Sequence, residues 1–107
     1  MKNLKDCIVG STVILTATFK NRLNQLSDLE SLKMTTFLEK GVKLEDTKQL
    51  DLLSHRVSAG TYEVVYTIPD NIDTDVFKSM TVVFEGKRGE IVQKTAVTIP
   101  ISWRSFP

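Results

Sequence analysis

The fold of this chain is decided by one stretch, SAGTYEVVYTIPD at residues 58–70. Gly60 gives the backbone the freedom that a tight corner requires. Every second residue from Tyr62 to Ile68 is then apolar, which is the period of a strand with one buried face. Pro69 and Asp70 end the strand, because proline lacks the N–H that a sheet ladder uses and Asp favours turns. A small-Gly-x-Tyr corner that leads into such a strand is typical of Greek-key β-sandwiches.

Alternating apolar and polar residues on both sides of this stretch predict further strands. We predict strands over residues 12–19, 32–39, 42–45, 49–57, 62–68, 77–85 and 90–101. Residues 20–31 read as a connection with a short helical turn, and residues 46–48 as a polar break. Gly86 and Gly89 frame a tight hairpin, in which we expect both glycines at positive φ.

Short strands separated by turn signals at intervals of about 8–12 residues predict an all-β fold. We expect a single immunoglobulin-like antiparallel β-sandwich of about seven to eight strands with Greek-key connections. It spans residues 1–107, with a short N-terminal arm at 1–9 and a C-terminal tail at 102–107.

The composition fits one globular domain. A chain of 107 residues with a hydrophobic fraction of 41% is long and apolar enough for one core. Fourteen Lys and Arg residues against thirteen Asp and Glu residues leave a net charge of +1. We therefore expect no nucleic-acid partner, because nonspecific nucleic-acid binding draws its affinity from many phosphate contacts.

The chain offers few groups for catalysis. It has one cysteine, Cys7, and one histidine, His55, so it can form neither an internal disulfide nor a cysteine zinc site. A Cys–His pair would also need an orienting third group and a pocket. Cys7 falls in the N-terminal arm and His55 on a predicted strand. We therefore expect no enzyme, no cofactor and no small-molecule substrate.

The N-terminal sequence predicts neither a signal peptide nor a membrane anchor. Asp6 and Gly10 interrupt its apolar residues. No stretch of the chain approaches the roughly 20 apolar residues that span a bilayer as a helix. We therefore expect no membrane partner.

An acidic loop at residues 70–75 is a weak candidate for a calcium site. Asp70, Asp73 and Asp75 supply hard oxygen ligands, which Ca²⁺ prefers. The helix–loop–helix calcium pattern also requires a glycine, which is missing, and a Glu at the twelfth position, where counting from Asp73 gives Phe84. The favoured interpretation is a solvated, turn-forming loop without metal.

Two regions are candidates for binding a partner. Lys87 and Arg88 lie at a predicted hairpin tip, and such tips often carry binding function, although charge there also serves solubility. Trp103, Arg104 and Phe106 lie near the C-terminus, and aromatic and Arg side chains are frequent interface residues. The alternative is that Trp103 closes the core and Phe106 is frayed.

Three motifs give the chain a resemblance to a known family. GSTVILTATF at residues 10–19, AGTY at 59–62 leading to Pro69-Asp70, and FEG at 84–86 are similar to motifs of small immunoglobulin-like proteins of tailed bacteriophage virions. The resemblance covers roughly residues 10–99. Val64 stands where antibody-type domains have their second core cysteine. The resemblance therefore implies a sandwich without a core disulfide.

The resemblance implies a non-enzymatic structural protein of a phage particle. Such a protein is a capsid decoration, head–tail connector (neck) or tail accessory protein. It binds other virion proteins, is present in many copies of a symmetric assembly, and is assembled in the host cytoplasm. The alternative is a carbohydrate- or cell-surface-binding immunoglobulin-like module. A calcium-dependent adhesion domain and, last, an enzyme are further alternatives.

Overall fold

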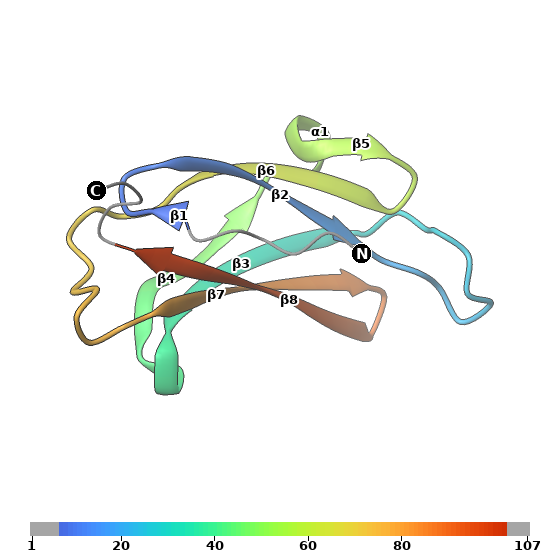
Figure 1. Ribbon diagram of the computed structural model, residues 1–107. Helices are drawn as coiled ribbons and strands as arrows, with labels where there is room; N and C mark the ends of the chain where they lie inside the picture. Colours follow the sequence, from blue (N-terminus) through green and yellow to red (C-terminus); the bar gives the residue numbers. More distant parts are fainter. Residues whose placement is uncertain (1–6, 103–107) are drawn as a thin grey trace.

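The computed structural model describes residues 7–102 and shows two β-sheets packed face to face (Figure 1). One sheet has five strands in the order β1-β8-β7-β3-β4, and the other has three in the order β2-β6-β5. The elements are β1 (Cys7–Ile8), β2 (Thr12–Thr18), β3 (Ser31–Leu38), the 3-10 turn η1 (Glu39–Gly41), β4 (Lys43–Leu50), α1 (Leu52–His55), β5 (Arg56–Ser58), β6 (Thr61–Thr67), β7 (Ser79–Arg88) and β8 (Ile91–Ser102). The predicted all-β sandwich is confirmed.

From β2 onward the connections alternate between crossovers and hairpins, as in a Greek key. The pairs β3–β4, β5–β6 and β7–β8 are each antiparallel neighbours in the same sheet. The chain changes sheets between β1 and β2, β2 and β3, β4 and β5, and β6 and β7. One pairing differs from the predicted antiparallel pattern, because β1 runs parallel to β8 with Cys7 opposite Ile101. Cys7 and Ile8 therefore belong to a sheet and not to an arm, and Ser102 is the last residue of β8.

The core lies where the predicted apolar faces of the two sheets meet. In β2 and β6 every second side chain is buried or half-buried, and the residues between them are exposed or half-exposed. This alternation is what one-sided burial of a strand requires. The fully buried large side chains are Tyr62, Phe84, Leu32, Ile68, Met80, Ile99, Val82 and Thr36.

A polar network crosses this core between the sheets. The buried Thr36 hydroxyl of β3 donates to Glu45 Oε1 of β4 at 3.0 Å, and the Tyr66 hydroxyl of β6 donates to the same oxygen. Burial raises the pKa of the Tyr66 hydroxyl, and the hydrogen bond to Glu45 raises it further. Thr36 can therefore occupy a core position because its hydroxyl has a partner.

The predicted strand over residues 49–57 and the polar break at 46–48 are wrong. β4 continues through the break to Leu50, and the chain then forms α1 before β5 begins at Arg56. β4 is an edge strand that, within residues 7–102, pairs with β3 alone, so most of its polar side chains are exposed and its sequence shows little apolar alternation. The short helix turns the chain from one sheet to the other.

The predicted hairpin with two glycines at positive φ is half right. β7 extends to Arg88, and of the two glycines Gly89 has a positive φ, of +61°. Gly86 lies inside the strand, where a Cβ would be 2.7 Å from Leu29 Cδ1 and 2.9 Å from Phe19 Cε1. Gly86 is therefore required for close packing and not for a turn.

The Gly60 corner fixes the crossover from β2 to β3. Gly60 has φ +66°, and its N–H donates to Asp28 Oδ1 at 2.9 Å while Phe19 N–H donates to its carbonyl at 2.8 Å. The buried Tyr62 hydroxyl accepts a hydrogen bond from Leu29 N–H at 3.0 Å. We call residues 27–30 the crossover segment, and it is attached to β6 and its corner through hydrogen bonds between backbone N–H groups and side-chain oxygens.

Charged side chains hold the same segment from two sides. Arg56 Nε donates to Asp28 Oδ1 at 3.0 Å. Arg88 Nε donates to the Asp28 carbonyl at 3.0 Å, and Arg88 Nη2 donates to the Ser27 carbonyl at 2.8 Å. The hydrogen bond from Arg56 and then that from Gly60 N–H hold the pKa of the Asp28 carboxyl below its usual value of 3.8. The crossover segment is thus joined to both sheets.

We predict that Gly60→Ala destabilises the protein far more than Gly89→Ala. Both glycines have positive φ, which disfavours a side chain by about 1–2 kcal/mol. A Cβ at Gly60 would also lie 2.6 Å from Phe19 O and from Ser27 N, whereas at Gly89 it would meet nothing within 4 Å. Crowding adds about 1–3 kcal/mol at Gly60 alone. Chemical denaturation measures both changes, and equal losses would contradict the packing at this corner.

We predict that Asp28→Asn removes part of the protein's loss of stability in acid. Because the pKa of Asp28 is lowered on folding, its stabilising contribution is complete above the ordinary value of 3.8 and is lost as the pH falls through the lower folded value. Asn keeps the oxygen that accepts from Gly60 N–H and removes the charge. Thermal unfolding should therefore show a lower melting temperature for the variant at pH 7 and a smaller decline below about pH 4.

Asp46→Asn is the matched control for this experiment. The Asp46 side chain is 97% exposed and lies 3.9 Å from Lys43 Nζ, so its ion pair contributes little. Its pH profile should overlay that of the unchanged protein. A profile of Asp28→Asn that overlays them as well would show that the Asp28 charge does not stabilise the crossover segment.

Candidate partner-binding site

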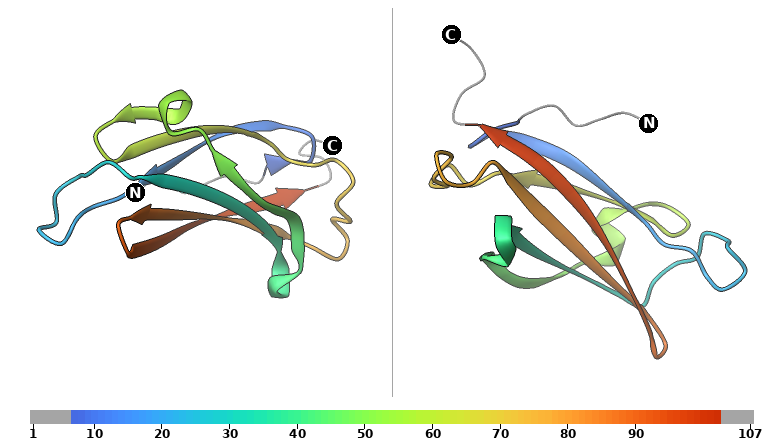
Figure 2. Two further views of the ribbon diagram at one scale, coloured as in Figure 1. Left: turned by 180° about the vertical axis from the view of Figure 1, so that it is seen from behind. Right: turned by 60° about the horizontal axis from the view of Figure 1, so that its bottom comes forward.

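The loop after β2 and the β7–β8 hairpin lie together at one end of the sandwich (Figures 1 and 2). We call this region, residues 20–26 and 87–93, the loop–hairpin end. The acidic loop between β6 and β7 lies at the opposite end. The loop–hairpin end contains Lys87 and Arg88, which the sequence singled out as partner-binding candidates.

The loop is held in shape by its own hydrogen bonds. Lys20 and Leu26 form an isolated antiparallel bridge, and Asn21 Oδ1 accepts from Leu23 N–H at 2.9 Å and from Gln25 N–H at 3.1 Å. Asn24 adopts φ +63°, which Asn tolerates better than most residues. The predicted helical turn is therefore wrong, because the Asn21 side chain and the positive φ of Asn24 close a tight loop instead.

Two side chains of the hairpin tie it to the loop and the crossover segment. Arg88 donates to the carbonyls of Ser27 and Asp28. Gln93 Nε2 donates to the Lys20 carbonyl at 2.8 Å, and its Oε1 is buried with no partner among the described residues. These bonds fix the relative positions of the loop and the hairpin, which come from distant parts of the sequence.

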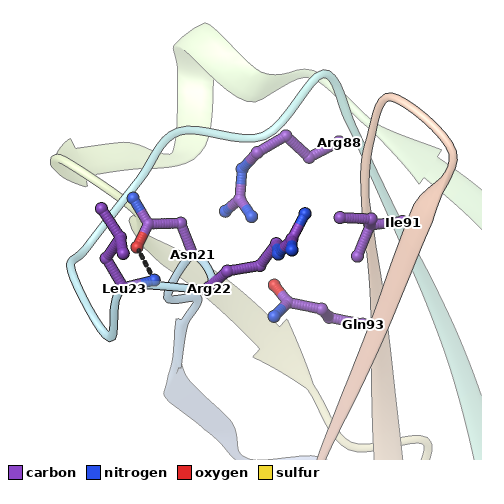
Figure 3. Close-up of a pocket in the computed structure, with 6 residues that line it drawn as sticks. All are labelled: Asn21, Arg22, Leu23, Arg88, Ile91 and Gln93. Atoms are coloured by element: carbon purple, nitrogen blue, oxygen red, sulfur yellow. Dashed lines mark hydrogen bonds between the residues drawn. The ribbon is translucent and has the colours of Figure 1, made fainter.

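An open pocket of about 250 Å³ lies between the loop and the hairpin (Figure 3). The residues that line it are Asn21, Arg22, Leu23, Arg88, Ile91 and Gln93. Figure 3 shows the side chains of Arg22 and Arg88 directed into the space between the loop and the hairpin. Leu23 and Ile91 are 76% and 44% exposed, so apolar surface borders the two cations.

The structure describes two of the five predicted partner-binding residues. Lys87 and Arg88 lie at the loop–hairpin end, where Lys87 is exposed and Arg88 half-buried. Trp103, Arg104 and Phe106 fall outside the described residues. β8 runs from Ile91 to the far end of the sandwich, so its last residue, Ser102, lies opposite the hairpin.

The sequence analysis missed Arg22 and Gln93. Arg22 lies in a region that we interpreted as a connection with a short helical turn, and Gln93 lies on a strand without apolar alternation at that point. They lie near Arg88 only because segments far apart in the sequence come together, as in the hydrogen bond between Gln93 and Lys20, which are 73 positions apart. A sequence signal did exist, since Asn21 and Asn24 flank Arg22 and Leu23 in the manner of a loop that presents side chains.

The acidic loop forms turns rather than a set of metal ligands. Asp73 Oδ1 accepts from Asp75 N–H at 3.0 Å, and the Asp73 carbonyl accepts from Val76 N–H and Phe77 N–H. Asp70, Asp73 and Asp75 are exposed. Within residues 7–102, no group of three or more His, Cys, Asp or Glu side chains is placed to hold a metal ion. The calcium alternative gains no support from this geometry.

The cysteine and the histidine lie in different elements. Cys7 lies in β1, at the edge of the five-stranded sheet. His55 lies in α1, which contacts β6, and its Nδ1 is 3.0 Å from the Glu63 carbonyl. The structure thus does not pair the two groups. In the part of the chain that the structure describes, no helix has the length and apolarity needed to cross a membrane.

Comparison of the chain with protein-family models, with curated proteins and with solved structures finds no match.

Proposed function

We propose that this chain is a non-enzymatic structural protein of a phage particle, which binds other virion proteins through its loop–hairpin end. The observation that carries the proposal is the pocket at this end, where exposed Leu23 and Ile91 border the guanidinium groups of Arg22 and Arg88. Mixed apolar and Arg surface of this kind is enriched where proteins bind one another. The resemblance of residues 10–99 to small immunoglobulin-like virion proteins supports the phage origin.

The outer face of the three-stranded sheet supports assembly in several copies. β2 is an edge strand of seven uncharged residues, and within residues 7–102 it pairs with β6 alone. Edge strands that do not pair with another chain usually carry charged residues or proline, which block such pairing. Ile14 and Val65 are cross-strand partners on this sheet and are 66% and 68% exposed. This face is a second contact surface for a repeated assembly.

The aromatic side chains argue against the carbohydrate-binding alternative. Sugar recognition commonly uses exposed aromatic rings as stacking platforms. Among the described aromatic residues, Phe19, Tyr62, Tyr66 and Phe84 are buried in the core and Phe37 and Phe77 are half-buried, so none is exposed. The surface of the described residues therefore favours binding through arginine and aliphatic groups, which suits a protein partner.

Quantitative mass spectrometry of purified virions tests the proposal. We predict that the chain is present in particles of the source phage at a fixed ratio to the major capsid protein. A ratio near one indicates capsid decoration, and a ratio many-fold lower indicates the neck or tail. Removal of loosely bound protein on a density gradient is the control, and absence of the chain from gradient-purified particles would refute the proposal.

A further inference from the structure

The pocket of the loop–hairpin end gathers positive charge that no ion pair within residues 7–102 neutralises, and the Asp28 carboxylate offsets the charge of Arg88 only in part. Arg22 and Arg88 both line it. The ion pairs within residues 7–102 use other cations, namely Lys43, Arg56 and Lys94. Two guanidinium groups that face one space repel each other, so an anion between them is favoured. Arginine also matches the geometry of a carboxylate with two parallel N–H donors.

Arg88 is already oriented for such a ligand. A guanidinium group has five N–H donors. Two of them, on Nε and Nη2, donate to the Asp28 and Ser27 carbonyls, which fix the plane of the group. The remaining donors are available to a ligand, and a side chain that is already fixed loses little freedom when it binds.

Arg22 supplies the second charge from the loop. It is exposed, and its backbone is held by the hydrogen bonds that Asn21 Oδ1 accepts from Leu23 and Gln25. Among the described residues its guanidinium group has neither an ion pair nor a hydrogen bond. Its full donor capacity therefore faces the pocket and solvent.

The rest of the lining is polar in part and aliphatic in part. Asn21 Oδ1 accepts two backbone N–H groups and Gln93 Nε2 donates to the Lys20 carbonyl, while Gln93 Oε1 has no partner among the described residues. Leu23 and Ile91 add exposed aliphatic surface beside the two arginines. At about 250 Å³ the pocket is also smaller than the usual 300–1,000 Å³ of a drug-sized ligand site.

We propose that this pocket binds an acidic side chain, Glu or Asp, within a partly apolar peptide segment of the partner. The carboxylate accepts hydrogen bonds from Arg22 and Arg88, and an apolar neighbour in the segment packs on Leu23 and Ile91. That the partner is a protein rests on the proposed function. The carboxylate selectivity of the pocket follows from its own residues.

An NMR titration of the ¹⁵N-labelled full chain tests the inference with capped Leu-Glu-Leu and Leu-Gln-Leu peptides. We expect the Glu peptide to shift the amide signals of residues 21–23 and 88–93, with a dissociation constant in the millimolar range. The Gln peptide should bind about tenfold more weakly, which corresponds to loss of one charged pair. Binding of the Glu peptide should also weaken between about 50 mM and 500 mM salt, because the charges are partly exposed.

Arg22→Gln is the test variant and Lys43→Gln its matched control. Arg22 is exposed and makes no ion pair, so its replacement should leave the melting temperature unchanged and weaken the Glu peptide about tenfold. Lys43 is an exposed cation on β4 whose side chain pairs with Asp46, so Lys43→Gln should leave peptide binding as it was. Equal binding of the Glu and Gln peptides, or full binding by Arg22→Gln, overturns the inference.

Two further probes separate the sources of the anion. Glucuronate and inorganic phosphate should compete with the Glu peptide only weakly. If glucuronate displaces it at lower concentration than the free peptide does, the pocket is an acidic-sugar site and the inference is wrong. The virion measurement is independent of the peptide titration. If the chain is absent from particles but binds the Glu peptide selectively, only the phage role is refuted. If it is present in particles but does not discriminate between the peptides, only the inference about the pocket is refuted.

Discussion

The hydrogen bond from Leu29 N–H to the Tyr62 hydroxyl is the constraint on which the rest of the structure depends. After β2 the chain must leave the three-stranded sheet for the five-stranded one, and Leu29 of the crossover segment becomes buried as it does so. A buried N–H without a partner destabilises a protein by about 1–3 kcal/mol. The Tyr62 hydroxyl supplies that partner from inside the core. The absence of a Cβ at Gly60 allows the backbones of Phe19, Gly60 and Ser27 to approach closely enough for this geometry.

The same segment links the fold to the candidate site. Asp28 pairs its carboxylate with Arg56 and Gly60 N–H, so Arg88 binds neutral carbonyl oxygens instead of a charged group. Arg88 is therefore held rigidly while its charge remains uncompensated by an ion pair among the described residues. A protein with a net charge of +1 thus has a locally cationic end. Binding selectivity at that end follows from the crossover segment, whose carboxylate binds Arg56 and whose carbonyl oxygens bind Arg88.

The sequence was sufficient for the strands that bury one face and insufficient where a residue's role depends on distant neighbours. The strands β2 and β6 and their buried faces were predicted, because burial of every second residue gives the sequence an apolar period of two. β4 was cut short, since an edge strand in water has no such period. Gly86 was assigned to a turn because local turn preferences do not show that Leu29 and Phe19 pack over it. No pocket was predicted, and of the residues that line it only Arg88 was a predicted binding residue, because Arg22 reaches the pocket through loop closure.

Native-state hydrogen exchange of the Leu29 amide tests the central claim most directly. If the Tyr62 hydroxyl secures the crossover segment, this amide exchanges only when the whole protein unfolds, and its opening free energy equals that of global unfolding measured by denaturation. An opening free energy far below the global value would mean that the crossover segment separates from the core on its own. The corner would then not be the constraint that organises the two sheets and the loop–hairpin end.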